Sequence, residues 1–446
     1  MSTAAHRRRD AALRAALRRH DRESSGHAAP PQVAGALADA LLTTDWRPAQ
    51  MQAVVRAVVA GRVPWARRLV AAVLSAYPRA PVDRPRELRQ FLINRALARR
   101  AVIRRRIVAP TRVVRMRWGA PALGDLAELA AFLELDGDAL DWFADRREIN
   151  RHARDERLRH YRYVWRPHRL IEAPKPRMRD LQRRLLDQIL SVAPVHDSAH
   201  GFVPGRGTHT FARAHTGADV LVRLDLRAFF SSITAARIYG LFRGLGYPEP
   251  VAHTLTALTT TRTPAHVLRE APDPHLAALL RQPHLPQGAP TSPALANLCA
   301  FRLDRRLSGL ADRFGVTYGR YADDLAFSGT LTNARVDRLV ELTGLIAAEE
   351  GFRVHPGKTR IRRRSQRQEL TGLVVNGRPA VPREQYDRLR AVLHNAARHG
   401  LAEANRDGHA DFAAHLAGRV AWMSHRHPAR AAKLHELLAR ALTARP

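Results

Sequence analysis

Two adjacent aspartates, Asp323 and Asp324, lie in the middle of a stretch of β-forming and apolar residues. Val316-Thr317-Tyr318 precedes them and Leu325-Ala326-Phe327 follows them, a pattern that predicts a tight hairpin with both acids near its turn. Two neighbouring carboxylates are not buried unpaired without a large desolvation cost, so we expect a basic group or a metal ion beside them. An Asp-Asp turn is common in proteins, and its function therefore depends on what the rest of the chain places near it.

A third aspartate, Asp225, follows a mainly apolar run, residues 220–224, which predicts a strand, and Phe230 comes five residues later. Between this strand and the hairpin, Gln287-Gly288 lies among the prolines of residues 285–293, which predicts a rigid turn that leads into a helix. One acid on a strand beside an acidic hairpin matches the needs of a two-metal phosphoryl-transfer site, where shared carboxylates hold two divalent cations.

The order and spacing of these three stretches closely resemble those of reverse transcriptases, which are RNA-directed DNA polymerases. The resemblance covers about residues 123–446 and implies an α+β chain with the right-hand polymerase fold of fingers, palm and thumb. It predicts the fingers with the N-terminal part of the reverse transcriptase domain (121–219), the palm with the catalytic aspartates (220–375) and a helical thumb (376–446). Helical periodicity and arginine content predict a helical, basic N-terminal extension (1–120) before them.

The same resemblance implies roles for single residues. Two Mg²⁺ ions would be held by Asp225, Asp323 and Asp324, and Lys358 would join them as a catalytic residue. Contacts with the incoming deoxynucleotide are implied for Arg169, Phe230, Gln287 and Gly288, and a position by the primer end for Tyr321. Phe230 aligns with the aromatic gate that crowds a 2′-hydroxyl, and its alternative is ordinary core packing.

Lysine is scarce in this chain, because only three of its 74 basic residues are lysines. An amine at Lys358 can donate a proton to leaving pyrophosphate, which an always-charged guanidinium does poorly. The turn before it departs from the family pattern, since His355 stands where asparagine is usual.

Two further segments resemble motifs of the retron reverse transcriptases. Phe211-Ala212-Arg213-Ala214-His215 stands where they carry Asn-Ala-x-x-His, and Leu370-Thr371-Gly372 stands where they carry Val-Thr-Gly, so each departs at its first residue. The resemblance implies RNA or primer contacts by His215, Thr371 and Gly372. It also implies that a structured non-coding RNA is copied into single-stranded DNA (msDNA) from an RNA 2′-hydroxyl, in anti-phage defence. The expected partners are this RNA, its DNA product, deoxynucleotides and a separately encoded effector.

Three alternatives stay open from the sequence. Group II intron enzymes normally carry a longer maturase region, and abortive-infection enzymes have more degraded Gln-Gly and Asp-Asp motifs than this chain. The third alternative is an RNA-binding protein without polymerase activity, and the presence of Asp225, Asp323 and Lys358 together argues against it.

The composition supports a nucleic-acid partner. The formal net charge of the 446 residues is +33, and the 45% hydrophobic content supports a sizeable core. Cys299 is the only cysteine, which excludes an internal disulfide and a multi-cysteine zinc site. No apolar run approaches the ~18 residues of a membrane helix, and the first ten residues lack the apolar core of a secretory signal. We therefore expect a cytoplasmic protein with no membrane partner.

Hydrophobic periodicity and the positions of helix-ending residues predict the remaining helices and strands. Helices are expected at 11–19, 33–42, 49–59, 63–76, 85–107, 179–192 and 336–350, with two short helices in 123–143, strands at 161–165 and 169–174, and mostly helix in 236–283. A hairpin at 370–377 is expected to close with Asn376-Gly377. The arginines Arg99-Arg100 and Arg104-Arg105-Arg106 form a basic face that is either solvated or in contact with RNA. Trp422 and Met423 are expected in the core rather than in a stacking platform.

Overall fold

The computed structural model describes residues 29–44, 46–78, 80–81, 85–95, 98, 101–107, 116–146, 148–151, 153–167, 169–424 and 428–443. The helix predicted at 11–19 and the arginine pair Arg99-Arg100 lie outside these residues. The chain forms two compact units, one from Met1–His160 with Ala236–Thr259 and the other from Tyr161–Ala235 with Thr260–Pro446. The four predicted parts, which follow the order of the chain, stay predictions.

In the described residues before 94, the first unit has four helices around one apolar core. They are α2 (Pro31–Leu42), α3 (Pro48–Val58), α4 (Ala66–Ala76) and α5 (Pro85–Ile93). Prolines in the first turns of α2 and α3 suit a position where the missing backbone N–H has no helical partner. The helix predicted for 85–107 was too long, because α5 ends at Ile93 and Ile103 forms an antiparallel β-bridge with Val59. The carbonyl of Val102 accepts from the N–H of Ala60, and the N–H of Arg104 donates to the carbonyl of Val58.

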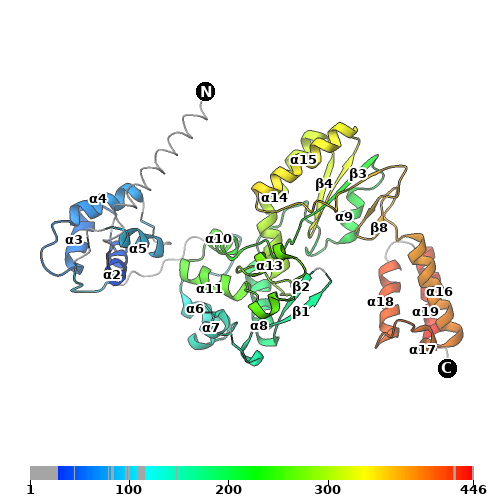
Figure 1. The fold of residues 1–446 in the computed structure, drawn as a ribbon, viewed down its shortest axis with the longest axis horizontal. Coiled ribbons are helices and arrows are strands. Elements are labelled where there is room, and N and C mark those ends of the chain that lie inside the picture. Colours follow the sequence, from blue (N-terminus) through cyan, green and yellow to red (C-terminus); the bar gives the residue numbers. More distant parts are fainter. Residues whose placement is uncertain are drawn as a thin grey trace. The chain divides into compact units, whose positions relative to one another are not determined.

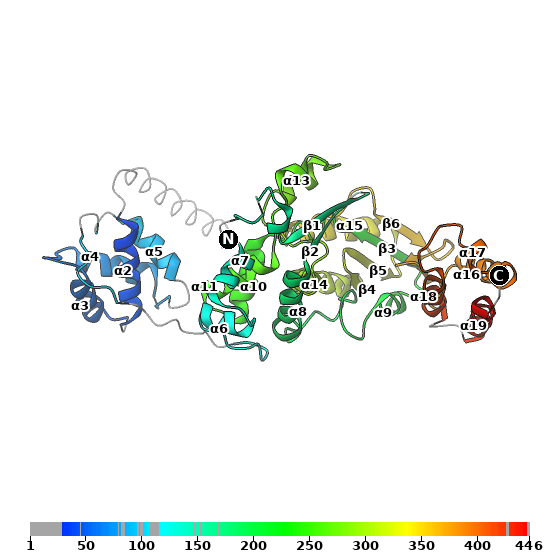
Figure 2. The same cartoon turned by 90° about the horizontal axis from the view of Figure 1, so that it is seen from below.

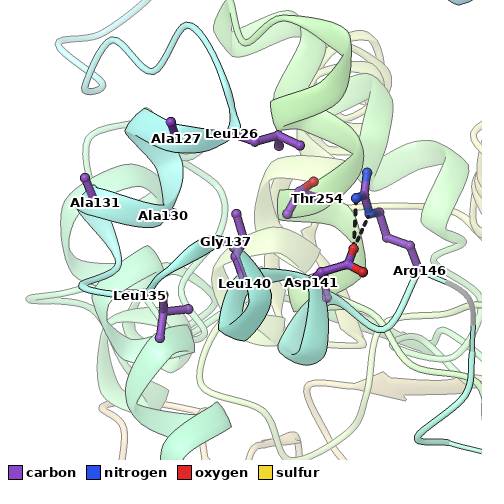
Figure 3. A pocket seen from close by; sticks show the side chains of 11 residues that line it. Leu126, Ala127, Ala130, Ala131, Leu135, Gly137, Leu140, Asp141, Arg146 and Thr254 are labelled. Carbon is purple, nitrogen blue, oxygen red and sulfur yellow. Dashed lines mark hydrogen bonds and ion pairs between the residues drawn. The ribbon is translucent and has the colours of Figure 1, made fainter.

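The same unit contains the two short helices expected in 123–143. They are α6 (Leu126–Phe132) and α7 (Gly137–Ala144), and aspartates Asp125 and Asp136 cap their N-termini. The 3₁₀ turn η2 (Glu156–Leu158) and the helices α10 (Ala235–Leu245) and α11 (Glu249–Thr259) follow. Helices α6, α7 and α11 line a cavity of about 440 Å³, shown in Figure 3, with an ion pair of 2.9 Å between Asp141 and Arg146 at its edge.

The second unit is built on a four-stranded antiparallel sheet with strand order β4-β5-β3-β6. Its strands are β3 (Val220–Asp225), β4 (Thr317–Tyr321), β5 (Asp324–Gly329) and β6 (Arg360–Arg363). The long helices α14 (Ser292–Phe314) and α15 (Asn333–Glu349) cover one face, and α9 (Thr208–Ala214) lies on the other (Figure 1 and Figure 2). The predicted acidic hairpin, the strand at 220–224 and the helix after the Gln-Gly turn are all confirmed.

The register of the sheet decides which face each side chain occupies. Val222 pairs with Phe327 and Leu224 pairs with Leu325, and all four are buried on the face covered by α14. Because side chains alternate along a strand, Asp225 and its partner Asp324 point to the opposite face. The sheet therefore carries mainly apolar side chains on the face covered by α14 and acids at one end of the other face.

Besides the sheet and the C-terminal helices, the second unit contains a strand pair, short helices and a small hairpin. Strands β1 (Tyr161–Arg166) and β2 (Arg169–Pro174) pair as expected, and α8 (Pro176–Leu185) continues as a π-helical turn, Leu186–Leu190. Helices α12 (Ala265–Leu268) and α13 (Pro274–Leu280) confirm, with α10 and α11, that 236–283 is mostly helical.

The hairpin expected at 370–377 closes at a different place. Its strands are β7 (Glu369–Leu370) and β8 (Leu373–Val374), so Thr371 and Gly372 form the turn, with φ of +47° and +80°. The prediction that the hairpin turns at Asn376-Gly377 was therefore wrong. The Asn376 side chain instead accepts from the N–H of Gln368 and donates to the carbonyls of residues 364 and 366, which holds the loop before β7.

The chain ends in helices with their own apolar core. They are α16 (Arg383–His399), α17 (Leu401–Ala404), α18 (Phe412–Ser424) and α19 (Pro428–Thr443). Met423 is buried in this core, as expected, but Trp422 is 37% exposed, so its assignment to the core was wrong. One helical step separates the two residues, which places them on different faces of α18. No helix in the described part of the chain is long and apolar enough to cross a membrane.

Candidate active site

Three carboxylates meet at one end of the sheet. Asp225, the last residue of β3, pairs with Asp324, the first residue of β5, and Asp323 lies in the turn before it. The N–H of Leu226 donates to the carbonyl of Asp323 at 2.9 Å, so the end of β3 is tied to the turn as well as to the strand. The antiparallel register therefore brings Asp225 next to two adjacent acids that lie about a hundred residues later in the sequence.

Burial and like charge raise the pKa of the two acids of the hairpin. Burial, with the charge of Asp324 as the next cause, raises the pKa of Asp323 to about 6. Burial also raises the pKa of Asp324, although the guanidinium of Arg223 donates to its Oδ1 at 2.9 Å and opposes the shift. The ammonium of Lys358 lies 3.1 Å from both carboxylate oxygens of Asp225. The site thus concentrates negative charge and needs cations, as the hairpin pattern indicated.

Asp225 and Asp323 border a cavity of about 910 Å³. Its lining includes six residues to which the resemblance gave a role: Arg169, Asp225, Phe230, Gln287, Asp323 and Lys358. Gly288, Tyr321 and Asp324 are neighbours of lining residues in the chain. The structure therefore brings most of the residues predicted for catalysis and nucleotide binding to one place. Basic side chains from β2 and from residue 358 line the same cavity as Asp225 and Asp323.

Aromatic side chains border the cavity beside the acids. Phe229 is buried against Phe352, whereas Phe230 is partly exposed and lines the cavity, so the second phenylalanine is available to a ligand. Phe202 was not predicted as a site residue. It is 50% exposed, and its ring centroid lies 6.2 Å from that of Phe230 and 6.4 Å from that of Tyr321.

A buried polar group joins the strand that carries Arg169 to the Gln-Gly turn. The N–H of Glu172 donates to the carbonyl of Gln287 at 2.8 Å. Gly288 has a φ of +133°, and a Cβ there would lie 3.1 Å from the carbonyl oxygen of Glu172, so this approach favours glycine.

The carboxylate of Glu172 is 1% exposed and accepts from Thr263 and from His284 Nε2, both at 2.7 Å. The other ring nitrogen of His284 lies 2.7 Å from the carbonyl of Gln282, which only accepts. The Glu172 side chain therefore ties β2 to Thr263 and to the residues just before the Gln-Gly turn.

The turn before Lys358 is closed by histidine instead of the asparagine usual in the family. The N–H of His355 donates to the carbonyl of Asp225 at 2.7 Å, and its Nδ1 accepts from the N–H of Gly357 at 3.2 Å. In such turns an asparagine side chain also accepts a hydrogen bond from the backbone N–H two residues later. The departure at this position therefore keeps the local hydrogen bond.

The donor set fits Mg²⁺, a hard cation that prefers oxygen ligands. Within the described residues, no group of three or more His, Cys, Asp or Glu side chains is arranged to hold a metal by itself. Mg²⁺ is usually held through one or two carboxylates together with waters and substrate phosphates, so Asp225 and Asp323 beside a nucleotide-sized cavity meet its requirements.

Comparison with known proteins decides the family. The reverse transcriptase (RNA-dependent DNA polymerase) family matches residues 165–375. The chain is 42% identical over 327 residues to the Mx65 retron reverse transcriptase of Myxococcus xanthus. This match covers 71% of this chain and 72% of that protein. The chain belongs to the retron reverse transcriptases. It is therefore an RNA-directed DNA polymerase, and enzymes with this domain generally use divalent metal ions.

Two other retron reverse transcriptases are similar over shorter stretches. The Mx162 enzyme of Myxococcus xanthus is 41% identical over 298 residues, or 62% of this chain and 60% of that protein. The Ec86 enzyme of Escherichia coli is 31% identical over 228 residues, or 51% of this chain and 65% of that protein.

In this retron reverse transcriptase, the side chain of His215 is fully buried, so it presents no surface for the expected contact with RNA. Its Nδ1 lies 2.7 Å from the hydroxyl of Ser328 on β5. A Cβ at Gly319 on β4 would lie 2.9 Å from its Nε2, so the ring spans both strands of the acidic hairpin. Burial lowers the pKa of His215 to about 3, and the imidazole is therefore neutral at physiological pH.

The two retron-type motifs meet in one apolar core. Phe211 and Ala212 of α9 pack with Leu221 and Ala326 of the sheet and with Leu370, Leu373 and Val375 around the small hairpin. The phenylalanine that replaces the usual asparagine is fully buried, and its ring centroid lies 6.0 Å from that of Tyr321. The Thr371-Gly372 turn is thereby attached to the same side of the sheet as the acids.

Sequence reasoning missed several residues that shape this site. Arg223 could have been found, because it alternates with Val222 and Leu224 and so shares a face with Asp225. Glu172 and His284 carry no local signal, since they lie 112 residues apart and meet only in the folded chain.

Proposed function

We propose that this enzyme copies a structured non-coding RNA into single-stranded DNA, starting from an RNA 2′-hydroxyl, in anti-phage defence beside a separately encoded effector. The observation that carries the polymerase site is the convergence of Asp225, Asp323 and Lys358 on one cavity with Arg169 and Phe230. The retron-type product is supported by the relatives, which are named retron reverse transcriptases, and by the common core of the two retron-type motifs. The strand pair β1–β2, the four-stranded sheet and the C-terminal helices suit the fingers, palm and thumb of a right hand.

Asp225 and Asp323 would hold two Mg²⁺ ions, which when bound stabilise charge on the attacking and leaving oxygens. Asp324 supports them less directly, because the guanidinium of Arg223 already occupies one of its oxygens. The main-chain carbonyl of Leu226 is a further oxygen next to Asp225.

The protein's own groups would position the nucleotide and move the proton. Arg169, exposed on β2, suits a triphosphate contact because a guanidinium binds phosphate oxygens in pairs. In the reaction, the primer hydroxyl gives its proton to solvent water and its oxygen forms the bond to the α-phosphorus, while the bond between that phosphorus and pyrophosphate breaks. Lys358 supplies a proton to the leaving pyrophosphate, for which its ammonium at the edge of the cavity is suited.

Discrimination would come from the walls of the cavity. Phe230 crowds the 2′ position of the sugar and so favours deoxynucleotides, while Gln287 and Gly288 contact the nucleotide and the template. Tyr321 lies by the primer end, supported by Phe211 behind it.

The choice of RNA cannot come from phosphate contacts alone, since these bind any RNA with strong salt dependence. Shape, 2′-hydroxyls and unstacked bases distinguish a structured RNA, and the turn at Thr371 and Gly372 is suited to approach one. His215 would contribute by fixing the acidic hairpin and α9, because its side chain is buried.

The test is to express the protein with its neighbouring non-coding locus, isolate the DNA and treat it with a 2′–5′ debranching enzyme. From the wild type we expect DNA that loses an RNA branch on this treatment, and from the Asp225→Asn variant we expect no DNA. The His215→Ala variant should lose branched product and extension of an annealed primer to the same extent. If every product starts from an ordinary 3′-hydroxyl, the proposed priming is wrong while the polymerase stands.

A further inference from the structure

Arg320, the residue before Tyr321 in the acidic hairpin, has a fully buried side chain. Its Nε and Nη2 donate to the two carboxylate oxygens of Asp304 at 2.8 and 2.7 Å, and Asp304 is also fully buried. Because Arg320 points to the face opposite Asp324, this ion pair lies between β4 and α14, on the far side of the sheet from the acids.

The third guanidinium nitrogen reaches the turn itself. Nη1 of Arg320 donates to the carbonyl of Ala322 and to Oδ1 of Asn297, each at 3.0 Å. Ala322 has a φ of +55°, a left-handed conformation that residues other than glycine rarely adopt without support from their surroundings. The carbonyl that Arg320 holds belongs to the residue directly before Asp323.

The turn is also held from a second side. Asn297 donates to the carbonyl of Gly201 at 2.9 Å, and a Cβ on Gly201 would lie 2.7 Å from the backbone nitrogen of Ala322. The hydroxyl of Tyr318 donates to Asp304 at 2.9 Å and completes the set. The left-handed residue is therefore enclosed between the guanidinium network and the backbone of residue 201.

Stability alone does not explain this network. Desolvation of two charges offsets much of their attraction, so well-packed apolar residues in place of a buried ion pair are often equally stable. The guanidinium of Arg320 also donates a hydrogen bond to the carbonyl of Ala322, which an apolar side chain is unable to do.

We propose that Arg320 is a positioning residue, which holds the left-handed turn at Ala322 so that the Asp323 carboxylate is directed toward the metal site. The proposal rests on the proposed role of Asp323 as a metal ligand. Asp304 and Asn297 act through Arg320 by fixing its guanidinium.

The test removes both charges of the pair together, in the double variant Arg320→Met with Asp304→Leu. Its matched control is Arg338→Met with Glu341→Leu, an exposed ion pair on α15 with 2.7 Å between its atoms. Two readouts are titrated with Mg²⁺: the rise in melting temperature of the protein without nucleic acid, and primer extension on an RNA template. We expect the Arg320–Asp304 variant to melt near the wild type and bind RNA equally well, but to need at least about ten-fold more Mg²⁺ in both titrations, because small misplacements of catalytic groups are costly.

A folded double variant with wild-type Mg²⁺ requirements in both titrations would overturn the proposal. If the double variant does not fold, Arg320→Lys replaces it, since lysine keeps the charge near Asp304 but cannot also reach Ala322 through a planar fork. The same rise in Mg²⁺ requirement is expected, and its absence again overturns the proposal. Near-normal extension by Asp323→Asn would instead refute the proposed function, so the two failures are distinguishable.

Discussion

The Asp323 carboxyl is expected to lower the stability of the metal-free protein at neutral pH, and Asp323→Asn should remove that cost. The pKa of Asp323 is raised from 3.8 to about 6 by burial and by the charge of Asp324. Between these two pH values the folded protein holds a proton that the unfolded chain has released. The free energy of unfolding therefore falls as the pH rises through this window, and the full cost is present above pH 6.

The magnitude follows from the size of the shift. A rise of about two pKa units corresponds to ~3 kcal/mol, at 1.36 kcal/mol per unit. Asparagine has nearly the same shape and does not ionise, so Asp323→Asn should raise the free energy of unfolding by an amount of this order at pH 8. The difference should shrink as the pH falls below 6 and should be nearly gone at pH 4.

The assay is urea denaturation in EDTA at pH 8 and pH 4, followed by circular dichroism. Asp337→Asn, at an exposed carboxylate on α15, is the matched control and should change stability little. A variant that is no more stable than the wild type at pH 8, or a gain that persists unchanged at pH 4, would refute the electrostatic argument. The same variant should make no DNA, so the carboxylate that lowers the stability of the metal-free protein is the one needed for DNA synthesis.

Two further predictions concern the walls of the cavity. Phe230→Ala should open space beside the 2′ position and let ribonucleotides compete, and unchanged discrimination between dGTP and GTP would show that Phe230 only packs. Glu172→Gln should loosen the link between β2 and the Gln287 turn, with ~1–3 kcal/mol lost from the free energy of unfolding. Its KM for deoxynucleotides should rise more than its kcat falls, and a change in kcat alone would contradict this linking role.

The acidic hairpin was predictable because its signals are local. Alternating apolar residues and two acids near a turn specify strands β4 and β5, and the apolar run before Asp225 specifies β3. The pairing of these strands then follows from burying one face, because a slip of one residue would move Val222 and Leu224 out of the core.

Features that depend on tertiary contacts were not predictable in this way. Residues 94–107 have good helix-forming composition, but part of their backbone pairs with Val58 and Ala60 instead. The Asn376-Gly377 pair fits a hairpin turn, yet the Asn376 side chain is used to hold neighbouring backbone groups. Histidine is a polar residue that can contact RNA, and only the packing of α9 on the sheet shows that His215 is buried.

The most direct measurement is extension of a DNA primer annealed to an RNA template, with Mg²⁺, by the wild type and by Asp225→Asn. The substitution removes a ligand charge and the partner of the Lys358 ammonium while it changes the shape of the side chain little. We expect template-complementary DNA from the wild type and a loss of orders of magnitude in the variant, with RNA binding retained at the same salt concentration. Near-normal extension by Asp225→Asn would contradict the assignment of this carboxylate group as the polymerase centre.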